Sequence, residues 1–177
     1  MNQYETIYQH AVDNYGLVSV AAAKELGVHR KELLRWVKSG RLEKRWRGLY
    51  RLTHYVPTEL DRYAEAVALV GGDDAIVFGE SVLAMHDLAL VNPAQLSVAR
   101  SGRVRRALPD WIRIVPLPPG ARRDEFEGIP CQNLADAFRA CRATVMSDRL
   151  AQGVRDAERR GLLRRAEAEA LKREFPR

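Results

Sequence analysis

The chain has 177 residues and a formal net charge of +6 at pH 7, and 46% of its residues are hydrophobic, which favours one or two globular domains with an acidic partner such as nucleic acid. Its two cysteines, Cys131 and Cys141, lack the spacing of a zinc site or a disulfide framework. No apolar run approaches the roughly 20 residues that span a bilayer, and the N-terminus has no signal-peptide core. We therefore expect a cytoplasmic protein that neither contacts a membrane nor binds a metal.

The first third of the chain predicts three helices. Apolar residues at helical spacing indicate a first helix over residues 2–14. Ser19 is a suitable N-cap for a second helix, because its hydroxyl can accept a hydrogen bond from a first-turn amide, and Gly27 can end that helix in a left-handed conformation. A third helix is expected to begin near His29 or Arg30.

A short basic hairpin should follow the third helix, which Gly40 ends. Residues 42–46 and 49–52 flank Arg47 and Gly48, so two strands joined by a glycine turn are expected. Two helices joined by a tight turn and followed by such a hairpin predict a winged helix-turn-helix.

The third helix has two different faces. At 100° per residue, Leu33, Leu34 and Val37 share one face, with Trp36 on its flank. The basic residues of the helix fall on another face. One face is therefore expected to be buried, and the other to meet a polyanion.

Positive charge is concentrated in residues 30–51, where nine Lys or Arg residues outnumber Glu32 and Glu43. Such a density is the electrostatic footprint of a DNA-binding protein, although a solvated basic surface is the alternative. The predicted DNA contacts on the third helix and the hairpin are His29, Arg30, Lys31, Arg35, Lys38, Lys44, Arg45 and Arg47.

The rest of the chain predicts a second, α/β domain. Its patterning favours short strands over residues 75–78, 95–100, 111–117 and 126–131, and helices over 59–70, 79–88, 133–141, 148–159 and 164–175. The last of these alternates Arg and Glu, which favours a solvated surface helix. The expected fold class is α+β, with a winged helix-turn-helix domain over residues 1–56, then an α/β domain over 57–177 with a small sheet and C-terminal helices.

A second basic cluster falls in the expected loop between two of these strands. It consists of Arg100, Arg103, Arg105 and Arg106. Arginine-rich loops bind phosphate or a partner protein, and they also serve simply to keep a surface solvated.

Ser81 and His86 are the only residues that suggest a hydrolytic pair. Five residues apart on a helix, they point about 140° from each other, and no acidic residue is placed to orient the histidine. We expect no catalytic residue, no cofactor and no enzymatic activity.

Four short segments of the first third form a recognisable pattern, namely Leu17-Val18, Leu26-Gly27-Val28, Ser39-Gly40-Arg41-Leu42 and Arg47-Gly48-Leu49-Tyr50. This pattern resembles the AbiEi-type antitoxins, the DNA-binding halves of bacterial toxin–antitoxin operons. The resemblance continues at Ser81, His86 and the Leu134-Ala135-Asp136 run, with Asp87 where the family has glycine.

This resemblance implies a transcriptional autorepressor that binds an inverted repeat in its own operator, acts in phage defence and counteracts a nucleotidyltransferase-like toxin, by direct contact or through the toxin's target. Two alternatives stay open. One is a plain winged-helix regulator whose second domain dimerises or senses a ligand, and the other is an enzyme that the winged helix delivers to DNA.

Overall fold

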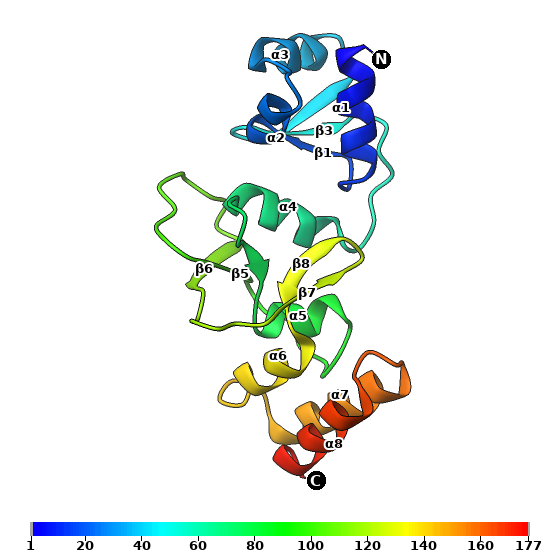
Figure 1. Cartoon of the computed structure of the whole chain (residues 1–177), viewed down its shortest axis with the longest axis vertical. Coiled ribbons are helices and arrows are strands. Elements are labelled where there is room, and N and C mark those ends of the chain that lie inside the picture. The colour runs from blue at the N-terminus through cyan, green and yellow to red at the C-terminus, as the bar shows by residue number, and fades with distance from the viewer. Residues whose placement is uncertain (1, 177) are drawn as a thin grey trace. The chain divides into compact units, whose positions relative to one another are not determined.

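The computed structural model describes residues 2–176 (Figure 1). The chain forms two compact units, one that ends at Leu69 and one that begins at Val70. The first unit is a winged helix-turn-helix, and the second combines a mixed sheet with helices. The expected α+β class is therefore confirmed.

The first unit contains three helices, most of a fourth, and a three-stranded antiparallel sheet in the order β1-β3-β2 (Figure 1). Its elements are α1 (Gln3–Val12), β1 (Leu17–Ser19), α2 (Val20–Glu25), α3 (Arg30–Lys38), β2 (Leu42–Trp46), β3 (Leu49–Leu52) and the beginning of α4 (Asp61–Val70). The predicted helices and the hairpin are confirmed. Strand β1, which has only three residues and pairs with β3, was not predicted from the sequence.

Local sequence explains the helix-turn-helix. The Ser19 hydroxyl accepts a hydrogen bond from the Ala22 amide at 3.0 Å, which caps the start of α2. Gly27 has a φ of +74°, a left-handed conformation that glycine adopts without a Cβ penalty. Val28 follows and is only 2% exposed. The turn between α2 and α3 is thus held by a glycine and a buried valine.

The core of this unit differs from the prediction on one face of α3. Leu33 is fully buried, but Leu34, which was expected beside it, is 42% exposed. Trp36 is buried in the core instead, with an exposed fraction of only 3%. The reason is α1, because the ring of Tyr4 meets the ring of Trp36 edge to face at 5.3 Å. The helix is therefore rotated toward its tryptophan flank.

The beginning of α4 belongs to the first unit, so the division falls after Leu69 rather than at Val56, where the sequence placed it. Two ion pairs explain this. Arg51 of β3 lies 3.4 Å from Asp61 and 3.5 Å from Glu65, and all three side chains are at most 9% exposed. Buried charges of this kind need their partners close by.

The second unit contains a five-stranded mixed sheet in the order β6-β5-β4-β8-β7. Its strands are β4 (Ile76–Val77), β5 (Leu96–Arg100), β6 (Ile112–Pro116), β7 (Arg123–Phe126) and β8 (Ile129–Gln132). Its helices are α5 (Glu80–Met85), α6 (Leu134–Ala140), α7 (Ser147–Arg159) and α8 (Arg165–Glu174). The pairs β4/β8 and β5/β6 are parallel, and the pairs β4/β5 and β7/β8 are antiparallel.

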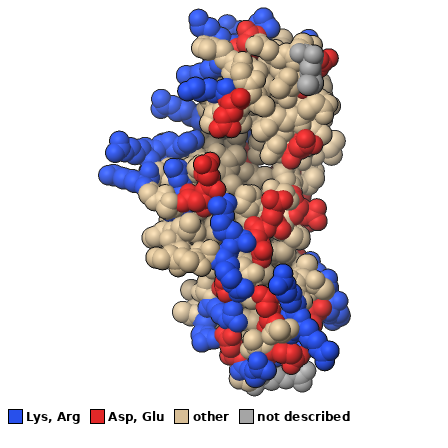
Figure 2. All heavy atoms as spheres, in the orientation of Figure 1, with Lys and Arg blue, Asp and Glu red and all other residues tan. Residues whose placement is uncertain are grey.

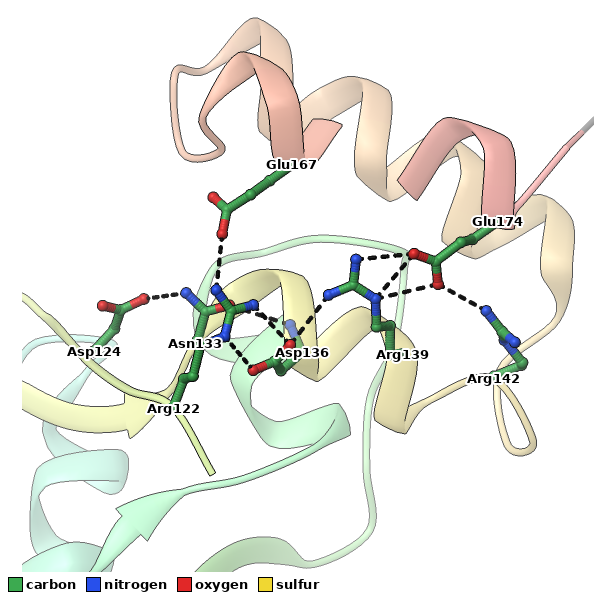
Figure 3. A network of polar contacts seen from close by, with 8 residues as sticks. All are labelled: Arg122, Asp124, Asn133, Asp136, Arg139, Arg142, Glu167 and Glu174. Carbon is green, nitrogen blue, oxygen red and sulfur yellow. Dashed lines mark hydrogen bonds and ion pairs between the residues drawn. The ribbon is translucent and has the colours of Figure 1, made fainter. Parts of the chain in front are cut away.

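Helix α8 is not the solvated surface helix that its charges suggested. Ala168 and Leu171 are fully buried, and α8 packs against α6 and α7. Its acidic side chains enter a network of ion pairs (Figure 3). Glu167 lies 3.3 Å from Arg122, and Glu174 lies 2.9 Å from Arg139. The acidic residues of α8 therefore form ion pairs with arginines outside the helix and not only with basic residues within it.

Burial rather than ion pairing should hold α8 in place. We expect Leu171→Ala to lower the free energy of unfolding by about 2–5 kcal/mol, since it opens a cavity in the core. Glu174→Ala removes partly exposed ion pairs and should cost about 1 kcal/mol or less. Urea unfolding followed by circular dichroism measures both, and an equal loss in the two variants would contradict this assignment.

Candidate nucleic-acid interface

Basic side chains gather over α3 and the hairpin of the first unit (Figure 2). All of the residues that the sequence singled out there are exposed, namely His29, Arg30, Lys31, Arg35, Lys38, Lys44, Arg45 and Arg47. They differ in what they contact. These contacts decide which of them are available to a ligand.

The N-terminus of α3 presents two unpaired basic side chains. His29 is its N-cap, and its Nδ1 accepts a hydrogen bond from the Lys31 amide at 3.2 Å. Only the Nε2 atom of His29 is therefore left for another contact. The side chains of Arg30 and Lys31 form no ion pair with any acidic residue among those described. A helix N-terminus also attracts anions through its free amides.

Arg35 lies one turn further along α3. Its guanidinium contacts the Glu32 carboxylate at 2.6 Å, but 70% of the Arg35 side chain is exposed. An exposed pair within one helix contributes little free energy, so Arg35 remains available to a partner. Lys38 lies in the last turn and is exposed.

The hairpin between β2 and β3 forms the wing. Arg47 and Gly48 make its turn, where Gly48 has a φ of +81°. Lys44 of β2 pairs in register with Tyr50, and the register then shifts before Trp46. The exposed side chains of Lys44 and Arg47 form no ion pair with a described residue, so both are available.

Arg45 is not available in the same way. It is the extra residue of the bulge between Lys44 and Trp46, and its guanidinium contacts Glu65 of α4 through Nε at 3.4 Å and Nη2 at 3.3 Å. Glu65 in turn contacts Arg51. The sequence analysis missed this pairing, although the spacing of Asp61 and Glu65, one helical turn apart, was a signal for it.

The second basic cluster lies in the loop between β5 and β6. Arg100 at its base is occupied, because Nη1 donates to the Val70 carbonyl at 3.1 Å. Ser101 donates its amide to Asp74 at 3.0 Å, which anchors the start of the loop. Arg103, Arg105 and Arg106 are exposed and contact no acidic side chain among the described residues. The structure thus separates one anchoring arginine from three available ones.

Ser81 and His86 do not meet as a hydrolytic pair. The fully buried Ser81 hydroxyl accepts a hydrogen bond from the Ser97 amide at 2.8 Å. His86 is 6% exposed, and its ring lies 4.0 Å from that of Phe126. Asp87 follows with a φ of +53°, a left-handed conformation that is uncommon for residues other than glycine. These residues support the fold of the second unit.

The comparison with known proteins agrees with the geometry of the first unit. A winged helix-turn-helix is a fold that proteins use to bind DNA. Residues 5–53, which run from α1 through the wing, match the model of a family described as transcriptional regulator, AbiEi antitoxin. No curated protein matches the chain. The predicted resemblance to the AbiEi antitoxins is therefore confirmed for these residues.

Among the described residues, no helix has the length and apolar character to cross a membrane.

The burial of His86 makes stability sensitive to acid. Burial, together with the smaller effect of the Arg160 charge and against the opposing effect of Asp124, lowers the pKa of His86 to about 4. Between pH 6.5 and 4 the unfolded chain therefore binds a proton that the folded chain does not, and stability is lost as the pH falls. We expect about 2 kcal/mol of loss between pH 7 and pH 5 from this residue.

Urea unfolding at several pH values measures this loss, and His86→Gln should show a flatter profile between pH 7 and 5 than the wild type. His54→Gln is the control, because His54 is exposed. Identical profiles for the wild type and His86→Gln would show that His86 is not the group responsible.

Proposed function

We propose that the protein is a DNA-binding transcriptional repressor that acts on its own operator as the antitoxin of a toxin–antitoxin system. The observation that carries this proposal is the exposed basic surface of α3 and the wing on a helix-turn-helix whose residues 5–53 match AbiEi antitoxin regulators. A polyanion is the natural partner for unpaired cations at this density.

In the proposed complex, α3 enters the major groove with its N-terminal end toward the bases. Arg30, Lys31 and Arg35 contact guanine edges or phosphates, since Arg and Lys donate to the O6 and N7 atoms of guanine. His29 and Lys38 contact the flanking backbone. The wing contributes Lys44 and Arg47 to phosphates or to the adjacent minor groove.

One winged helix makes few base contacts, so we propose that two copies bind an inverted repeat. Two-fold symmetry of the protein would then match the symmetry of the operator. The half-sites are expected about one helical turn of DNA, or a multiple of it, apart.

We also propose that the second unit carries the antitoxin activity against a nucleotidyltransferase-like toxin, in a system of phage defence. The support is the resemblance of its Ser81, His86 and 134–136 segments to the same family. If the second unit instead only dimerises or senses a ligand, the protein binds scattered promoters and gives no rescue from a toxin. If it is a nuclease, the duplex loses its integrity when Mg²⁺ is added.

The proposal predicts different effects for the recognition helix and the wing. Arg35→Ala should weaken operator binding by about 1–3 kcal/mol and relax the base preference, because it removes a base contact. Arg47→Ala should weaken binding to every duplex alike and should lower the salt slope by about one, because it removes a phosphate contact. Gel shifts at several salt concentrations on operator and shuffled DNA measure both effects.

The matched control for these two variants is Arg173→Ala, since Arg173 is an exposed arginine on α8, outside the proposed interface. It removes the same charge and should leave the base preference unchanged. If neither Arg35→Ala nor Arg47→Ala alters binding, our assignment of the groove and the wing is wrong.

For the loop between β5 and β6, we propose a second contact with the DNA backbone. Its three available arginines lie within four residues of one another, and the base of the loop is anchored to Asp74. Replacing Arg103, Arg105 and Arg106 together with alanine should reduce the magnitude of the salt slope by up to about three and leave the base preference intact.

The control replaces three exposed or half-exposed arginines of the same unit, Arg155, Arg159 and Arg165, with alanine. This control variant has the same net charge as the loop variant, and its salt slope should stay closer to that of the wild type. An unchanged slope in the loop variant, combined with weaker binding to the toxin, would instead assign the loop to a protein contact.

A further inference from the structure

The wing has two faces that differ in their partners. Arg45 is the extra residue of the bulge in β2, so strict alternation of side chains does not hold between Lys44 and Arg45, and their contacts define the two faces. Lys44 lies on the face of Tyr50, which is its register partner and part of the core. Arg45 shares the other face with Glu43, whose carboxylate is 3.6 Å away. Lys44 forms no ion pair with a described residue, so of these two side chains only Lys44 is available to DNA.

On its own face, Arg45 completes a cluster of four charges from three elements. Glu65 of α4 lies between two arginines, 3.3 Å from Arg45 and 3.5 Å from Arg51. Arg51 also lies 3.4 Å from Asp61. The side chains of Arg51, Asp61 and Glu65 are at most 9% exposed, whereas 37% of Arg45 is exposed. Arg45 is thus by far the most exposed of these four side chains.

Charge balance keeps Arg45 in this place. With Arg45 present, two guanidinium groups neutralise two buried carboxylates. Without it, Glu65 keeps only Arg51, which it shares with Asp61, and a buried carboxylate with an incomplete set of partners is costly. The pair formed by Arg45 and Glu65 therefore differs from the exposed pair of Arg35 with Glu32, where 27% of the carboxylate side chain is exposed.

We propose that Glu65 is a positioning residue that holds Arg45 away from DNA, so that the wing contacts phosphate through Lys44 and Arg47 while α4 is in place. This inference rests on the proposed function and concerns its regulation. Release of Arg45 from Glu65 adds one cation to the wing. The DNA affinity of the first unit is then set in part by α4.

Helix α4 connects the two units along the chain, so the pair formed by Arg45 and Glu65 links the wing to the second unit. Helix α4 begins in the first unit and its last residue, Val70, belongs to the second. A partner that binds the second unit and displaces α4 would separate Glu65 from Arg45 and change the affinity of the wing for DNA. Partner binding and DNA binding are thereby coupled through one carboxylate.

Four proteins test the proposal: the full-length wild type, Arg45→Ala, Glu65→Ala and the double variant. Arg45→Ala should leave the salt slope of DNA binding unchanged, because Arg45 does not contact DNA while Glu65 holds it. Glu65→Ala should make the slope steeper by about one, because Arg45 then keeps only its exposed contact with Glu43 and can reach a phosphate. The double variant should return to the slope of the wild type.

The double variant separates the release of Arg45 from a general effect of removing a negative charge. A steeper slope that persists without Arg45 would overturn the proposal. So would a shallower slope in Arg45→Ala, which would place Arg45 on DNA with Glu65 still present. Glu59→Ala is the matched charge control, since Glu59 is exposed just before α4, and it should leave the slope unchanged.

Folding of the variants is checked by urea unfolding. Arg51 keeps Asp61 as a partner in Glu65→Ala, and Glu65→Gln keeps the volume of the side chain and should change the slope in the same direction.

If the wild type shows no salt-dependent DNA binding, the proposed function fails and this inference fails with it. If Lys44→Ala and Arg47→Ala each lower the slope but Glu65→Ala and Glu65→Gln have no effect, only the inference is wrong.

Discussion

The burial of one face of α3 is the constraint on which the rest of the first unit depends. Leu33 and Trp36 are buried under α1 and the sheet, and this fixes the rotation of the helix about its axis. Because successive residues are separated by 100°, fixing the apolar face also fixes where the basic residues point. The exposed positions of Arg30, Lys31 and Arg35 follow from the packing of the tryptophan.

Exposure alone does not decide which cations are available to DNA. Arg35 and Arg45 are both exposed and both paired, but the partner of Arg35 is a more exposed residue of the same helix, whereas Glu65 is buried and shared with Arg51. The free energy needed to separate a pair rises as its charges are removed from water. Arg35 can therefore leave Glu32 to contact DNA, whereas Arg45 stays paired with Glu65 for as long as α4 is in place.

The winged helix-turn-helix was predictable because local signals determine it. Ser19, Gly27 and Gly48 act within a few residues of their own position, as caps and turns do. Two features that the sequence did not predict involve contacts between distant parts of the chain. Trp36 is buried because Tyr4 packs on it, and Arg45 is engaged because Glu65 reaches it from a helix 20 residues away in sequence. Periodicity carries no information about such contacts.

The most direct test of the central claim is a salt titration of DNA binding by the full-length protein. The two duplexes are the DNA immediately upstream of its own gene and a shuffled sequence of the same length and composition. We expect tighter binding to the upstream DNA, with an affinity that falls steeply and linearly on a log–log plot against salt. Equal binding to the two duplexes, or no dependence on salt, would contradict a winged-helix repressor that reads its own operator.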